Sequence, residues 1–139
     1  MKQLLKCGCS AFVLLLTFIG CSKGEEQMLI ENVWVVYEMK EHADSAWMNN
    51  WEYPTLSFMG KDKYVFQSSS ICIIARVRIE KNNKINFESD IGMSFSSLSE
   101  AICHNLLVYG INRYDINDYD KLVLTGDNGE KIILNKKNF

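Results

Sequence analysis

Alternation of apolar and polar side chains runs through most of the chain after residue 32 and predicts a protein built mainly of antiparallel strands. The regular alternation at 71–80, followed by a turn and a return strand to 87, predicts one pair of strands. Similar patterns at 55–66 and at 121–135 predict two hairpins. Side chains two positions apart share a face of a sheet, so one set from each strand should face the core. The inward set that we expect is Phe58, Phe66, Ile73, Val77, Phe87, Leu122 and Leu124.

Two further segments complete the predicted architecture. The first is a strand at 32–40, whose fully apolar face would hold Val33, Val35, Tyr37 and Met39. The second is a helix from Ser97 to about Val108, because apolar residues there follow helical spacing and Ser97 with Glu100 has the form of a capping box. The predicted fold is mainly β (α+β), a strongly twisted antiparallel sheet or small open barrel of about seven or eight strands with one helix packed across it.

The N-terminus has a different character. A basic start precedes a charge-free, largely apolar stretch that ends in Gly-Cys at Cys21. The stretch is shorter than the ~20 apolar residues of a membrane-spanning helix, so it indicates a secretory signal helix. The small residue before Cys21 resembles the bacterial lipobox, although Phe18 stands where that motif prefers Leu. This resemblance implies cleavage before Cys21 and a lipid on its sulfur.

The predicted domain organisation follows from this cut. We expect a lipoprotein signal peptide at 1–20, a polar tether at 21–29 and a single β-rich domain at 30–139. Ser22 after the lipidated cysteine resembles outer-membrane sorting in Gram-negative bacteria. We therefore expect a lipid-anchored protein of the bacterial cell envelope, at the outer membrane, on its periplasmic or its surface face. The mature chain would keep 13 of its 15 Lys and Arg residues against 17 Asp and Glu, a composition that argues against nucleic acid as a partner.

The cysteines suggest a covalent link. Of the five, two lie in the signal and Cys21 takes the lipid, which leaves Cys72 and Cys103 in an oxidising compartment. An even remainder in an exported domain predicts a Cys72–Cys103 disulfide, which would stabilise the fold by about 3–4 kcal/mol on the chain-entropy model. The alternative is two separate buried thiols.

The segment 41–53 interrupts the alternation and is long for a loop in a small domain. It holds Trp47, Trp51 and Tyr53, which are candidates for a ligand mouth or for a partner-binding or inhibitory surface. The alternative is that these aromatic side chains cover one end of a small barrel as part of its core.

Several short segments in this order resemble the META-domain (HslJ-like) family. They are Trp34 in the first strand, Pro54-Thr55-Leu56-Ser57-Phe58, the Cys72 strand, the Cys103 helix, and Tyr114-Asp115-Ile116 followed by Lys121-Leu122-Val123-Leu124. The sequence around each cysteine departs from the usual family pattern, which leaves a neighbouring lipocalin-like family open. The resemblance implies an envelope-associated module without catalytic residues, linked in the family to stress or drug tolerance.

Motifs for catalysis or for cofactor binding are absent from the sequence. His42 and His104 lie in different elements, and no metal-ligand, phosphate-loop or nucleophile-elbow spacing occurs. We therefore expect no enzyme activity, cofactor or metal. The leading hypothesis is an envelope lipoprotein with a binding or structural role, which contacts the membrane through the lipid on Cys21 and an envelope protein through its domain. The alternative is a lipocalin-like carrier of a small apolar ligand, which needs a cavity that the bulky inward residues would fill.

Overall fold

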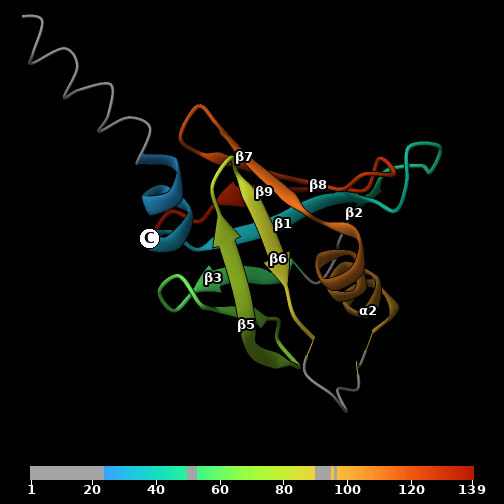
Figure 1. Cartoon of the computed structure of the whole chain (residues 1–139). Helices are drawn as coiled ribbons and strands as arrows, with labels where there is room; N and C mark the ends of the chain where they lie inside the picture. Colours follow the sequence, from blue (N-terminus) through green and yellow to red (C-terminus); the bar gives the residue numbers. More distant parts are fainter. Residues whose placement is uncertain (1–23, 50–52, 90–94, 96) are drawn as a thin grey trace, which may run out of the picture.

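The computed structural model describes residues 24–49, 53–89, 95 and 97–139. Within them the protein is a closed, eight-stranded antiparallel barrel with one additional short strand and two helical segments (Figure 1). The strands are β1 (Trp34–Lys40), β2 (Met48–Asn49), β3 (Thr55–Phe58), β4 (Lys63–Gln67), β5 (Cys72–Glu80), β6 (Lys84–Phe87), β7 (Arg113–Asn117), β8 (Lys121–Thr125) and β9 (Lys131–Lys136).

Pairing of the first long strand with the last strand closes the barrel. β1 and β9 are antiparallel, with Trp34 opposite Lys136 at one end and Lys40 opposite Lys131 at the other. β1 also pairs with β3 through Trp34 and Val35, and the order then follows the chain to β9. β2 pairs with Glu38 and Met39, further along β1 than the residues that pair with β3. The predicted mainly β fold with a helix is confirmed, in its barrel form. The barrel is closed, because β1 pairs with β3 on one edge and with the last strand, β9, on the other.

The apolar face predicted for the first strand is not the face that packs inward. Trp34, Val36 and Met39 are buried, whereas the side chain of Tyr37 is 47% exposed. The register shifts between Val36 and Glu38, which pair with successive residues of β9, so Tyr37 is the extra residue of a β-bulge. A bulge moves the following side chains to the other face, which a strict period of two cannot anticipate. The predicted apolar face held Val33, Val35, Tyr37 and Met39, of which Met39 is buried and Tyr37 exposed.

Two helical segments cover opposite ends of the barrel. α2 (Leu98–Asn105) lies at the end that carries the β4–β5 and β8–β9 turns, and residues 24–31 form a helix at the other end (Figure 1). The predicted start of α2 is confirmed, since the Ser97 hydroxyl accepts a hydrogen bond of 3.2 Å from the backbone N–H of Glu100. A π-helical turn, η1 (Leu106–Gly110), extends α2 and closes with a 2.9 Å bond from Ile111 N–H to the Leu106 carbonyl.

Residues 24–29 are helical, so the prediction of a tether over 21–29 is wrong for them. Leu29 is fully buried, and its carbonyl accepts a 3.1 Å bond from the Trp34 indole N–H. The acidic side chains of this helix hold it to two turns of the barrel. Glu25 accepts a 3.1 Å bond from the Asn83 amide, and Glu26 forms a 3.4 Å ion pair with Lys61. The signal segment 1–20 and Cys21 lie outside the described residues.

Side chains fill the interior of the barrel. All seven residues of the predicted inward set are buried, which confirms the alternation on which they were chosen. The large side chains with less than 2% exposure come from most strands and from both helical segments. They are Leu29, Trp34, Met39, Leu56, Tyr64, Phe66, Ile73, Ile85, Leu107, Leu122, Leu124 and Ile132. In the described part of the chain, the helices are too short or too polar to cross a bilayer.

Candidate functional site

α2 and η1 present two different faces. The inner face consists of Glu100, Cys103, His104 and Leu107, all buried against the barrel. The other face consists of Ile102, Asn105, Leu106 and Tyr109, which follow the spacing i, i+3, i+4, i+7 of neighbours on a helix. This second face lines a surface hollow.

Two carboxylates from distant parts of the sequence form the opposite side of this hollow. Glu41 directly follows β1 and Glu130 directly precedes β9, and the last residue of β1 pairs with the first residue of β9. A 3.0 Å bond from Ala43 N–H to the Asn128 carbonyl joins the two connecting segments. Closure of the barrel therefore brings the two carboxylates to the same rim.

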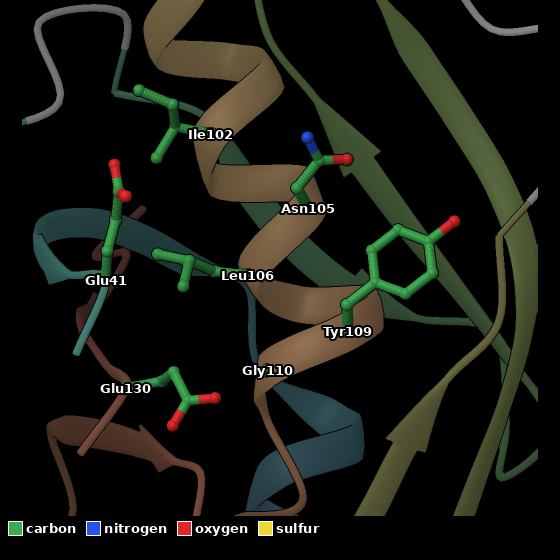
Figure 2. A pocket seen from close by; sticks show the side chains of 7 residues that line it. All are labelled: Glu41, Ile102, Asn105, Leu106, Tyr109, Gly110 and Glu130. Carbon is green, nitrogen blue, oxygen red and sulfur yellow. The ribbon is translucent and has the colours of Figure 1, made fainter. Parts of the chain in front are cut away.

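The hollow has a volume of about 390 Å³ and is lined by the helix face, by Gly110 and by the two carboxylates. In Figure 2, Ile102 and Leu106 extend from the helix toward the side of Glu41, and Glu130 lies below them on the hairpin side. We call this feature the helix–hairpin groove. Its lining is Glu41, Ile102, Asn105, Leu106, Tyr109, Gly110 and Glu130.

Two glycines allow the helix end to approach the hairpin. A Cβ atom on Gly126 would overlap the Gly110 carbonyl oxygen, and a Cβ atom on Gly110 would lie 3.1 Å from Cγ of Glu130. Because neither glycine has a side chain, the π turn packs directly on the β8–β9 connection. The groove is therefore shaped by backbone contact as well as by side chains.

Glu130 is a buried carboxylate, with 9% of its surface exposed. Its Oε1 atom accepts a 2.7 Å bond from the backbone N–H of Asn128, within the β8–β9 turn. Over the described residues, the ion pair found joins Lys61 to Glu26, and neither Glu41 nor Glu130 has a basic side chain within salt-bridge distance. Both carboxylates therefore face the groove without a cationic neighbour from the described chain.

The inner face of α2 carries polar groups of a different kind. The Tyr64 hydroxyl donates a 2.7 Å bond to the Glu88 carbonyl and lies 3.1 Å from Nε2 of His104. Burial of the imidazole lowers the pKa of His104. Since Tyr64 gives its proton to Glu88, neutral His104 donates from Nε2 to the Tyr64 oxygen. With His104 only 3% exposed, this network supports the packing of α2 and offers no access to a substrate.

Glu100 takes part in a second buried network. Its Oε1 atom accepts bonds of 2.8 and 2.9 Å from the hydroxyls of Ser68 and Ser70, in the turn between β4 and β5. These bonds fasten the first turn of α2 to the barrel and satisfy a carboxylate that is 0% exposed. Among the residues that the structure describes, no three His, Cys, Asp or Glu side chains are grouped as metal ligands.

The predicted disulfide is not formed. Cys72 is exposed on the outward face of β5, whereas Cys103 is fully buried on the inner face of α2, and the structure has no bond between them. Alternate residues of a strand point to opposite sides, and the inward position next to Cys72 is Ile73. The strand therefore directs the Cys72 side chain away from the core in which Cys103 lies.

The aromatic candidates of the 41–53 segment lie on the surface where they are described. Trp47 is 44% exposed with Nζ of Lys40 5.4 Å from its ring centroid, and Tyr53 is 53% exposed. For these two residues, the alternative of a core role at the barrel end is wrong. Trp51 and the lipid-attachment candidate Cys21 lie outside the described residues.

The groove carboxylates were not among the predicted site residues. The helical spacing of Ile102, Asn105, Leu106 and Tyr109 is readable in the sequence, but it does not show that this face remains uncovered. Glu41 and Glu130 are 89 positions apart in the numbering, and only the pairing of β1 with β9 makes them neighbours. No local sequence signal connects them.

Comparison with known proteins bears on the fold. No family model and no curated protein matches the chain. The NMR structure of a protein from Burkholderia xenovorans is similar, with a TM-score of 0.61 and 18% sequence identity over 81% of this chain and 86% of that chain. At this identity the likeness establishes a shared fold alone. The barrel is compatible with either a ligand-binding or a structural role.

Proposed function

We propose that the protein is a non-enzymatic lipoprotein of the bacterial cell envelope that binds a ligand or partner in the helix–hairpin groove. One observation carries this proposal: the barrel interior is filled with side chains, whereas the groove is an open hollow on the outside. Its volume lies within the range of about 300–1,000 Å³ that is usual for ligand sites. An apolar wall with a few polar groups also fits a binding site.

The position of the anchor supports this function. Cys21 precedes the described helix by three positions, which an extended chain spans in about 10 Å. That helix contacts Lys61 and Asn83, in the turns at one end of the barrel, and the groove lies at the other end. A lipid on Cys21 would therefore hold the helix end near the bilayer and leave the groove directed toward the aqueous phase.

The META-domain resemblance supports the same assignment and adds a stress-related role as a proposal. The resemblance of Ser22 to an outer-membrane sorting signal also supports a location in the cell envelope. Neither depends on the Cys72–Cys103 bond, because the resemblance rests on the order of several segments. Catalysis is not part of the proposal, and His104 is buried beneath α2.

A partner-binding role of the 41–53 segment is the second candidate, and the exposure of Trp47 and Tyr53 favours it. Aromatic side chains are common energetic anchors of protein interfaces. This surface and the groove share the segment that starts at Glu41, so one partner of sufficient size can contact both. A carrier that holds an apolar ligand inside the barrel is less well supported, because Phe66, Leu122 and Leu124 occupy that space.

Two measurements test the proposal. Intact mass of the protein purified from membranes should show a lipid-modified chain that begins at Cys21, and an unmodified chain cut elsewhere would remove the anchor. Titration with Nile red, a neutral apolar dye, followed by amide chemical shifts, should perturb residues 102–110 and 130. Perturbation of inward residues such as Phe66 and Leu124 instead would support the carrier. If the dye binds in the groove, the variant Ile102→Glu, at a partly buried lining position, should weaken its binding. The outward substitution Ile74→Glu on β5 serves as its control.

A further inference from the structure

We propose that the helix–hairpin groove accepts an alkylguanidinium group, the chemistry of an arginine side chain presented by a partner protein. This inference rests on the proposed function, since it names what the groove binds. It follows from the charge of the lining, from the burial of one carboxylate and from the apolar wall of the helix.

The groove lining carries negative groups and no positive ones. Glu41 and Glu130 supply two carboxylates, and no Lys, Arg or His is among the lining residues. The two lysines next to them in sequence belong to strand ends, where Lys40 and Lys131 pair across β1 and β9, and Lys40 places its Nζ over Trp47. The lining is therefore complementary to a cation.

Glu130 provides an independent indication. Only 9% of Glu130 is exposed, and a carboxylate that is withdrawn from water needs hydrogen-bond or charge partners. Its one described hydrogen bond, from Asn128 N–H, uses Oε1, and a carboxylate has acceptor sites for several donors. Oε2 lies close to Gly110, another residue of the groove lining, at 3.2 Å from where a Cβ of Gly110 would be. A cation entering the groove would supply the charged partner that the described residues do not.

The helix face favours a guanidinium on an apolar stem over a compact ammonium. Ile102 and Leu106 form an apolar wall that suits the methylene groups of an arginine side chain. Figure 2 shows the exposed ring of Tyr109 on the side of the helix away from Glu41 and Glu130, so the apolar wall is formed by Ile102 and Leu106 alone. Guanidinium donates from several N–H groups in a fork, whereas ammonium is a point charge with a tightly held water shell.

The source of the group follows from the shape of the site. The groove is open along one face of α2 and η1 and lies at the barrel end that carries exposed Trp47. An arginine on a protein surface can enter such a groove while its neighbours contact the rim. A free guanidinium compound would gain the groove contacts alone.

The experiment uses the full chain, labelled with nitrogen-15 in a neutral detergent, and follows the amide signals of Leu106, Gly110 and Glu130. The probes are N-acetylargininamide, the isosteric but uncharged N-acetylcitrullinamide, N-acetyllysinamide, and the peptide Gly-Leu-Arg-Leu-Gly. We expect the arginine amide to bind at least about tenfold more tightly than the citrulline amide, because charge-assisted hydrogen bonds are lost in the latter. The lysine amide should bind less tightly than the arginine amide, and the peptide more tightly.

The variant Glu41→Gln/Glu130→Gln should remove the preference for arginine over citrulline. The amide introduced in place of Glu130 keeps an oxygen that can accept from Asn128 N–H, so the turn is preserved. The matched control is Glu80→Gln, an exposed carboxylate at the other barrel end, which should leave the preference unchanged.

Each other outcome has a defined meaning. Equal binding of the arginine and citrulline amides in the groove would overturn the cation inference and leave the groove as a binding site. A peptide that binds no better than the arginine amide would overturn the assignment to a protein partner. If neither these probes nor Nile red perturbs the groove, the inference and the proposed function both fail.

Discussion

Replacement of Leu29 by alanine is the sharpest test of the helix that precedes the barrel. The sequence pattern predicts a tether at this position, where the substitution would have no effect on stability. In the structure Leu29 is 0% exposed and is part of the hydrophobic core. The two descriptions therefore differ in what Leu29→Ala should do.

The expected magnitude follows from burial. Complete burial of a leucine side chain contributes about 1.5–3 kcal/mol, and Leu→Ala substitutions in cores cost about 2–5 kcal/mol. The helix that carries Leu29 is terminal and can shift into part of the space left behind, so we expect a value near the lower limit, about 2–3 kcal/mol. With a urea m-value of about 1.5 kcal/mol per molar, the midpoint of unfolding should fall by about 1–2 M.

Urea unfolding of the chain from Ser22 onward, followed by tryptophan fluorescence, measures this change. Trp34 is a suitable reporter because it is fully buried and its indole N–H bonds to the Leu29 carbonyl. The control is Gln27→Ala, an exposed position of the same helix, which should stay within about 0.5 kcal/mol of the unmodified chain. If the two variants unfold at the same urea concentration, the helix is not docked and the reasoning is refuted.

Three further predictions concern the cysteines, the buried histidine and the close contact between turns. In the folded chain from Ser22 onward, Ellman's reagent should modify Cys72 at once and Cys103 only after unfolding, and an oxidised chain in which neither reacts would contradict the structure. The lowered pKa of His104 means that the unfolded chain takes up a proton first as pH falls below about 6.5, so the free energy of unfolding should decrease from there down through the folded pKa. His104→Gln should flatten this pH dependence of the free energy of unfolding, and His42→Gln should not. An unchanged pH profile in His104→Gln would mean that another group causes the dependence. Gly126→Ala should destabilise the fold by about 1–3 kcal/mol in the same urea assay, since its Cβ would overlap the π turn, and a neutral result would mean that the turns do not pack closely.

Much of the barrel could be predicted because its strands obey a local rule. Side chains alternate between inside and outside, and hydrophobic burial selects one set, so the inward residues of β3 to β6 and of β8 and β9 are readable from composition and spacing. The cap of α2 was also readable, since Ser97 and Glu100 lie within one turn of helix. These features depend on neighbours a few positions apart.

Predictions from local patterns were wrong where contacts with a distant element decided the structure. Tyr37 is displaced outward by a bulge that exists only in the pairing of β1 with β9. The polar residues at the start of the 24–31 helix are typical of a tether. In the structure, their acidic side chains bond to Lys61 and Asn83 and hold the helix to the barrel. The count of cysteines suggested a bond, but the face of β5 on which Cys72 lies does not allow it in this structure.

The candidate site belongs almost wholly to the tertiary structure. The sequence by itself determined the strands, the helix start, the helical stripe that includes Leu106 and the apolar identity of the core, because these follow from backbone period and side-chain polarity. Closure of the barrel placed Glu41 beside Glu130, and close backbone contact at Gly110 and Gly126 set the helix against them. Contacts between residues so far apart in the chain depend on how all the strands close together, which no local pattern encodes.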